Sequence, residues 1–330
     1  MNNKRLLNHI PNKTATRGFS ILEFLVASLL SMIVLMAVSS TYFTARGLNK
    51  SANARIGIQQ DLRNAANMIV RDARMAGNFG CFNMANFPAS AVIEDKSSDE
   101  YTLKTAGVNN LLPIKEINKL SYPGFVQADN DKALLFQYGI DIDIDKKNPT
   151  AKTAIVSSCF GIAKPHTEIK DLAAAKSALK ITNSDQDGSI AIMKHEMIAY
   201  AVGTLGKESG LFRFQLSNDG SWSSPQLLIK DIKSMKIRYF YANCSDAPNA
   251  SASATSEETF DHKVALDRSL NAKSPASVQI ELDGKNADSD KGDKKNENGK
   301  SIDVEKDNTV DIYNINATIR GGNVCADRSL

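Results

Sequence analysis

One carboxylate, Glu23, lies within an apolar run near the N-terminus of the chain. The run extends from Phe19 to about Val38, and its remaining polar residues are serines. A carboxylate inside a membrane helix costs on the order of 2.5 kcal/mol or more and usually marks a functional contact. If the chain is cut after Gly18, the new α-amino group of Phe19 lies about one helical turn from Glu23. An ion pair between these groups, within one chain or between neighbours, would favour packing one subunit against the next.

The apolar run is long enough to cross a membrane as a helix. About 20 residues at a rise of about 1.5 Å span a hydrocarbon core of about 30 Å. The preceding segment, from Met1 to Arg17, contains four basic residues and no acidic residue. Because such a basic flank stays in the cytoplasm, the sequence predicts a single-pass inner-membrane protein whose remaining residues lie in the periplasm.

A cleavage site is expected before this helix and not after it. An ordinary secretory signal has a shorter apolar region that ends in a small-residue cleavage site. Here residues 39–45 continue the helix, and no proline follows Gly18 until Pro88. We therefore expect residues 1–18 to be a leader peptide. An uncut membrane sensor or adhesin is the alternative, and it predicts no cleavage after Gly18 and tolerance of Glu23→Ala.

Four cysteines, an even number without a C-x-x-C pair, indicate disulfides rather than a zinc site. Four cysteines allow three connectivities, and the sequence leaves all three open. The spacing favours two disulfides, which join Cys81 to Cys159 and Cys244 to Cys325. Disulfides would place the bulk of the chain in an oxidising compartment such as the periplasm. Four buried free thiols in a cytosolic protein are the alternative.

One segment partly matches a calcium-binding loop. Asn183, Asp185, Asp187 and Gly188 occupy positions 1, 3, 5 and 6 of the pattern, which has oxygen donors at alternate residues and a glycine for the sharp turn. Position 12 should be a bidentate glutamate, but it is Lys194. We therefore interpret the segment as a polar turn, keep a calcium site as the alternative, and predict no metal or other cofactor.

Catalytic motifs are missing from the sequence. His195-Glu196 begins a string typical of zinc proteases, but Ala199 stands where the second zinc ligand would be. The sequence has no nucleophile elbow, no P-loop and no dinucleotide-binding glycine motif. With 40 basic and 37 acidic residues the charge is near balance, which indicates no nucleic-acid partner. We predict that the chain is not an enzyme.

The helix that begins in the membrane is expected to continue into the exported part of the chain. Beyond the apolar run, apolar residues recur at three- and four-residue spacing, and arginines lie elsewhere around the helix. Gly77 is a stop signal. The sequence thus predicts one helix over residues 19–77, with 19–42 as its membrane half. Its apolar stripe comprises Ile58, Leu62, Ala65, Ile69, Ala73 and Ala76.

Runs rich in β-branched and aromatic residues recur through residues 78–330 and predict strands. A long helix followed by many strands is an α+β plan, in which an antiparallel sheet covers the apolar face of the helix. Segments 246–262 and 283–308 are small-polar or charge-dense, and we expect them to be mobile surface loops inserted in this domain. The predicted strands are 133–138, 154–162, 190–202, 211–216, 232–242, 276–282 and 310–319.

The residues around the expected cleavage site resemble a known processing motif. Arg17-Gly18-Phe19-Ser20-Ile21-Leu22-Glu23 is similar to the prepilin motif of type IV pilins and type II secretion pseudopilins. This resemblance implies the type IV pilin fold, cleavage after Gly18 by the prepilin peptidase, and N-methylation of Phe19. It also implies that Glu23 is the glutamate used in assembly.

A second stretch narrows the resemblance. Arg74-Met75-Ala76-Gly77-Asn78-Phe79-Gly80-Cys81-Phe82 resembles the sequence that follows the long helix in the PilW family of minor pilins, called PilJ in some systems. Many major pilins carry a proline near the end of the membrane segment, and its absence here favours a minor subunit. The resemblance implies a minor pilin required for type IV pilus assembly. A J-type minor pseudopilin of a type II secretion system is the alternative.

The same resemblance implies partners. Minor pilins of this kind associate into a complex that primes the filament and sits at its tip, often with a large adhesin. The implied partners of this chain are other minor pilins, the major pilin, a tip adhesin, the prepilin peptidase and the inner-membrane assembly platform. The work of assembly would come from a cytoplasmic ATPase and not from this chain.

Overall fold

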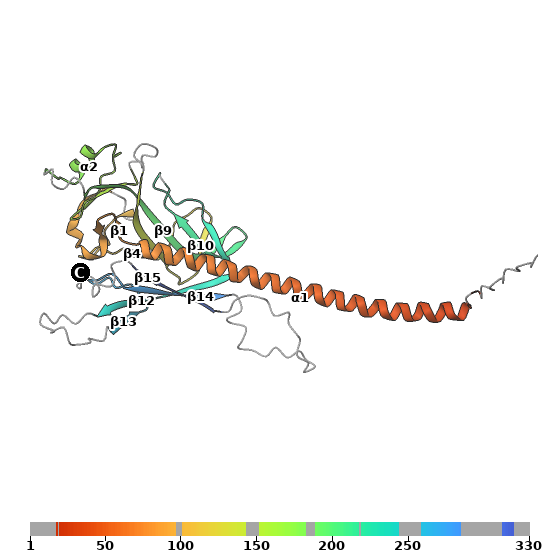
Figure 1. Cartoon of the computed structure of the whole chain (residues 1–330). Helices are drawn as coiled ribbons and strands as arrows, with labels where there is room; N and C mark the ends of the chain where they lie inside the picture. Colours follow the sequence, from red (N-terminus) through yellow and green to blue (C-terminus); the bar gives the residue numbers. More distant parts are fainter. Residues whose placement is uncertain are drawn as a thin grey trace, which may run out of the picture. The chain divides into compact units, whose positions relative to one another are not determined.

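A computed structural model describes residues 18, 20–96, 101–142, 152–182, 189–217, 219–243, 259–284 and 312–319 (Figure 1). They form a long N-terminal helix followed by a domain of mostly antiparallel strands, so the fold is α+β as predicted. The chain divides into two compact units, Met1–Ala54 and Arg55–Leu330. The elements are α1 (Ile21–Met75), β1 (Asn78–Phe79), β2 (Phe82–Asn83), the 3₁₀ turns η1 (Met84–Asn86) and η2 (Ala89–Ala91), β3 (Val92–Asp95), β4 (Ile114–Ile117), β5 (Phe125–Gln127), β6 (Ala133–Asp141), β7 (Ala154–Ser157), β8 (Ile162–Lys164), α2 (Leu172–Ala178), β9 (Ala191–Leu205), β10 (Glu208–Gln215), β11 (Gln226–Lys230), β12 (Ile232–Asn243), β13 (Thr259–Lys263), β14 (Ser277–Gly284) and β15 (Ile312–Thr318).

The first unit contains the apolar part of α1. Its large apolar side chains are exposed, and an 18-residue window reaches a mean hydropathy of 2.5 with none of it buried. Hydroxyl groups in this part donate to carbonyls of their own helix, as Ser28 does to Leu25 and Ser31 to Ala27, which satisfies them without an outside partner. By length and composition α1 can cross a membrane, which is compatible with a single-pass membrane protein.

The second unit contains the rest of α1 and all the described strands. Most of the predicted apolar stripe is buried here: Leu62 and Ala65 are 4% and 1% exposed, and Ile69, Ala73 and Ala76 are fully buried. Ile58 is only partly buried. These side chains share one hydrophobic core with residues from two sheets. Figure 1 shows this part of α1 between β9 and β10 on one side and β12 and β14 on the other. A single covering sheet was expected, and the structure has two.

Gly77 ends the helix region in the way its residue type predicts. Its φ of 81° lies in the left-handed region, which a residue without a Cβ adopts at little cost. The Gly77 N–H donates to the carbonyl of Gln137 at 2.8 Å, and the Met84 N–H donates to the Gly77 carbonyl at 2.8 Å. An added Cβ would lie 3.0 Å from Pro113 Cβ. The chain can therefore turn sharply from α1 into β1 against β6.

The larger sheet is built around β9. This strand pairs antiparallel with β10 and β7 along one edge and with β5 and β6 along the other edge. β11 extends the sheet beyond β10, β4 beyond β6, and β8 beyond β7; β3 then pairs with β8 in parallel. Side chains of β9 alternate between two cores, because Ile198 and Tyr200 face the core that contains α1, whereas Met197 and Ala199 face a second one.

The smaller sheet has the antiparallel order β13-β12-β14-β15. Its inward residues meet in register, with Ile237 opposite Ile280 and Tyr239 opposite Val278. All four belong to the core that contains the α1 stripe. The two sheets and the second half of α1 are thus held by one hydrophobic core.

Two expectations about the strands need correction. The run 154–162 is two strands, β7 and β8, separated by a turn in which the Ser158 N–H donates to the Gly161 carbonyl at 2.8 Å. The segment 246–262 is not a loop throughout, because β13 begins at Thr259 and pairs with β12. Pairing between segments distant in the chain is not visible in local composition. Residues 246–258 and 285–308 lie outside the described residues.

Candidate functional site

The prepilin-like residues lie at the start of α1. Gly18 is exposed, and Glu23 lies in the first turn of the helix. The Ser20 N–H donates to Glu23 Oε2 at 3.1 Å, and the Leu22 N–H donates to Ser20 Oγ at 3.3 Å. The first backbone bond of the helix runs from the Phe24 N–H to the Ser20 carbonyl at 3.1 Å. Phe19, whose amino group was expected to pair with Glu23, lies outside the described residues.

This pattern is a variant of the capping box, in which a serine and the acid three residues later satisfy helix-terminal N–H groups; here the serine accepts from Leu22 instead of from Glu23. The sequence signal is Ser20-x-x-Glu23, in which Glu23 was expected only as a membrane carboxylate. A carboxylate has about four lone-pair positions, so one bond from Ser20 leaves capacity for a further donor. Glu23 can therefore cap its own helix and also accept an ion pair.

The cysteine expectations are partly tested. Cys81 and Cys159 form a disulfide, which joins the β1–β2 turn to the β7–β8 turn. Beside it, Ser157 Oγ donates to the carbonyl of Phe79 at 2.7 Å. Gly80, next to Cys81, has a φ of 68°, so both glycines of the PilW-like stretch adopt left-handed backbone. The pairing of Cys244 with Cys325 falls outside the described residues.

α1 carries an interior carboxylate that was not expected from the sequence. Asp72 is fully buried, and its Oδ2 accepts the hydroxyl of Tyr200 at 2.6 Å and the guanidinium of Arg213 at 3.3 Å. Its Oδ1 accepts the hydroxyl of Tyr138 and the guanidinium of Arg71 at 3.3 and 3.2 Å. Burial and the Asp72 charge raise the pKa of Tyr200 and of Tyr138. This cluster fixes α1 to β6, β9 and β10.

A second interior carboxylate links the two sheets. Glu116 on β4 accepts the Tyr239 hydroxyl at 3.0 Å and the Leu266 N–H at 3.1 Å through Oε1. Its Oε2 accepts the Lys132 ammonium at 2.6 Å, and its backbone carbonyl accepts Arg268 at 2.8 Å. Burial, followed by the Glu116 charge, raises the pKa of Tyr239. These contacts hold the two sheets together at β4 and β12.

The zinc-protease-like pair is an ordinary part of β9. His195 is fully buried, and Glu196 is 1% exposed and accepts the Lys194 ammonium at 3.0 Å. Adjacent residues of a strand point to opposite faces, so the two side chains do not converge on one site. Among the side chains that the structure describes, no group of three His, Cys, Asp or Glu could hold a metal ion.

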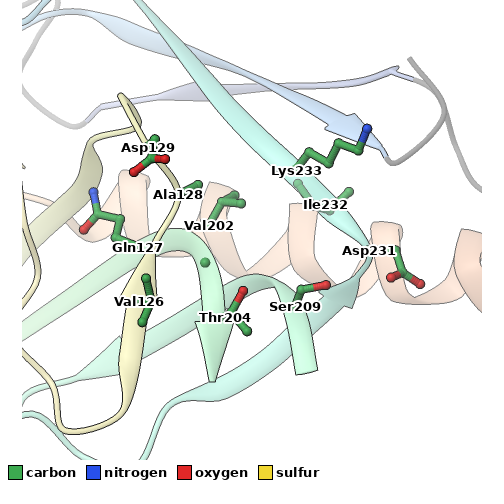
Figure 2. A pocket seen from close by; sticks show the side chains of 11 residues that line it. Val126, Gln127, Ala128, Asp129, Val202, Thr204, Ser209, Asp231, Ile232 and Lys233 are labelled. Carbon is green, nitrogen blue, oxygen red and sulfur yellow. The ribbon is translucent and has the colours of Figure 1, made fainter. Parts of the chain in front are cut away.

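A surface groove of about 330 Å³ lies where β5, β9 and β10 approach the start of β12 (Figure 2). Apolar side chains of Val126 and Val202 line it together with Asp129, Asp231 and Lys233. None of the predicted site residues contributes to its lining.

Comparisons of the chain with family models, with curated proteins and with solved structures find no match.

Proposed function

We propose that the chain is a minor pilin of the PilW family that acts in type IV pilus assembly. The observation that carries this proposal is the prepilin-like motif at the start of a 55-residue helix, with Glu23 in the first turn. The apolar first half of that helix and a second half packed in a β-rich domain support the type IV pilin fold. The Cys81–Cys159 disulfide supports an exported domain.

In this proposal α1 stores the subunit in the inner membrane and then packs it into the filament. Cleavage after Gly18 creates a cationic amino group on Phe19, which pairs with Glu23 of a neighbouring subunit. In a low dielectric such a pair offsets the cost of holding the carboxylate away from water. The domain beyond α1 supplies lateral contacts to other minor pilins at the tip and to a tip adhesin.

The first experiment is intact mass and N-terminal sequencing of the membrane-extracted chain with and without the prepilin peptidase. We expect a mature chain that starts at Phe19, with a methylated amino group, only when the peptidase is present. A chain that keeps Met1, or one cut beyond Ser39, would contradict the proposal. Deletion should abolish surface pili; an isolated defect in type II secretion would favour the pseudopilin alternative.

The capping box allows a second experiment that separates two roles of Glu23. Glu23→Gln keeps an oxygen that can accept the Ser20 N–H but removes the charge, whereas Glu23→Ala removes both. Ser20→Ala is the matched control, because it removes the other half of the box. We expect Glu23→Gln to lose piliation in sheared-pilus immunoblots while Ser20→Ala retains it. Normal piliation in Glu23→Gln would assign Glu23 to helix capping alone.

A further inference from the structure

The segment Tyr101–Lys104 lies outside the named helices and strands, yet side chains of neighbouring strands bind all four of its carbonyls. Lys164 of β8 donates to the first at 2.9 Å. Lys115 of β4 donates to the second, and to the fourth at 2.9 Å. Gln137 of β6 donates to the third at 3.3 Å. The segment is therefore held by side chains from three strands.

Two further contacts seat the same segment. Leu103 is fully buried, and its N–H donates to Asp95 Oδ2 of β3 at 2.6 Å. The ring of Tyr101 lies against the indole of Trp222, with centroids 5.7 Å apart. Trp222 is the single tryptophan of the chain. Its environment therefore reports on whether the segment is in place.

Hydrogen-bond direction fixes the proton on His195. The amide nitrogen of Gln137 donates to the carbonyls of Leu103 and Leu112 at 3.3 and 2.7 Å, so its oxygen faces His195 Nε2 at 3.2 Å. Nε2 must then carry the proton and donate it. Nδ1 is left as an acceptor, and it receives the Lys164 ammonium at 3.1 Å. The network thus requires a neutral imidazole.

The surroundings of the imidazole oppose a second proton. Burial, followed by the charges of Lys164, Lys115 and Lys194, lowers the pKa of His195 well below its ordinary value. The charge of Asp95 on β3 acts in the opposite direction to burial on the pKa of Lys115 and of Lys164, because it favours their charged forms. The uncharged neighbours are Gln137 of β6 and the ring of Phe79 of β1, whose centroid is 5.9 Å away. Protonation of His195 therefore places a further positive charge close to three lysines.

We propose that His195 is an acid-sensitive latch for the segment Tyr101–Lys104. A proton added at Nδ1 points at the Lys164 ammonium, so the bond between them is lost and Lys164 turns away from the Tyr101 carbonyl. The segment then moves away from the strands that hold it and exposes Leu103 and one face of Trp222. This device lies within the β-rich domain and does not depend on filament assembly.

Trp222 fluorescence tests the latch in the full-length chain in detergent micelles, titrated from pH 8 to pH 4. We expect the emission to shift to longer wavelength on acidification before far-UV circular dichroism changes. His195→Gln, which can accept from Lys164 and donate to Gln137 but cannot be charged, should abolish this early shift. His262→Gln, which replaces an exposed histidine of β13, is the matched control and should keep it. An unchanged shift in His195→Gln would assign the response to another group and overturn the proposal.

Hydrogen exchange of the wild-type chain supplies a test that needs no variant. If opening requires one proton, protection of the Leu103 amide should fall about tenfold for each pH unit from the ordinary pKa of histidine, 6.5, down to the midpoint of opening. Amides in the centre of β9 should keep their protection over the same range. Protection of Leu103 that is independent of pH, or that is lost together with β9, would overturn the proposal.

Discussion

The Tyr200 hydroxyl lies 2.6 Å from Oδ2 of Asp72 and joins the middle of β9 to the buried face of α1. Around this bond, Tyr138 and Arg213 bring β6 and β10 to the same carboxylate. The rest of the stripe consists of small and aliphatic side chains, which define the rotation of a helix less sharply than directional bonds do. The Asp72 cluster therefore specifies the rotation of α1 and its position along the sheet.

Replacing Asp72 should destabilise the domain strongly. Asp72→Ala leaves Arg213 and two tyrosine hydroxyls in the interior without their acceptor, and breaking a buried pair in this way costs about 3–5 kcal/mol. The free energy of unfolding can be measured from urea titrations followed by Trp222 fluorescence. Arg74→Ala, an exposed change on the same helix, should stay within about 0.5 kcal/mol of the wild type. Equal urea midpoints for the two variants would contradict this role of Asp72.

The Cys81–Cys159 disulfide should stabilise the domain mainly as a cross-link. The two cysteines are 78 residues apart, and closing a loop of this length removes about 4 kcal/mol of chain entropy from the unfolded state. Cys81→Ser, Cys159→Ser and the double variant should therefore lose the same amount in urea titrations. Losses that add in the double variant would indicate side-chain packing instead of a cross-link.

Stability should rise with pH above neutrality. Burial lowers the pKa of Lys115 to about 7 and that of Lys164 to about 8, from an ordinary value of 10.5. Between these values and 10.5 the unfolded chain binds more protons than the folded chain, so the free energy of unfolding increases with pH. Above pH 10 the sign reverses, because burial raises the pKa of Tyr241 to about 12 and the folded chain keeps that proton.

Urea midpoints between pH 6 and pH 11 check this profile. The double variant Lys115→Met and Lys164→Met is the control, since it should flatten the rise between pH 7 and pH 10. A rise of the same slope in the double variant would locate the titrating groups elsewhere.

Gly203 should not tolerate a side chain. An added Cβ would overlap the carbonyl oxygen of Val126 and the ring of Phe125, where β5 meets β9. We expect Gly203→Ala to lower the free energy of unfolding by about 1–3 kcal/mol, as overpacking does. Gly57→Ala is the opposite case, because nothing lies within 4 Å of its added Cβ and alanine favours the helix by about 1 kcal/mol. The two urea midpoints should move in opposite directions.

Much of the helix was predictable because its signals are local. The stripe from Leu62 to Ala76 repeats at helical spacing, and Gly77 ends it in the left-handed conformation. The burial of Asp72 had a weaker signal: it follows Ile69 by three residues and so falls on the stripe. Its partner Arg213 lies 141 residues away in the sequence, and no local pattern predicts that contact.

Among the strands, too, local sequence predicts some features, whereas others depend on contacts between distant segments. The runs that became β6, β9 and β12 are strongly apolar or alternating, so composition predicts them. The placement of the second sheet against the other side of α1 depends on contacts between distant segments, and so does β13. The neutral state of His195 depends on the orientation of Gln137 and on Lys164, which lies on another strand.

The large sequence separation between Asp72 and its partners also has a consequence for folding. Its partners Tyr138, Tyr200 and Arg213 follow it by 66, 128 and 141 residues. Contacts of such high sequence separation slow folding, because the loops must close before the contacts stabilise them. In a chain that emerges N-terminus first, the α1 stripe therefore stays partly uncovered until the strands of both sheets have followed. During that interval the apolar side chains of the stripe are exposed to aggregation.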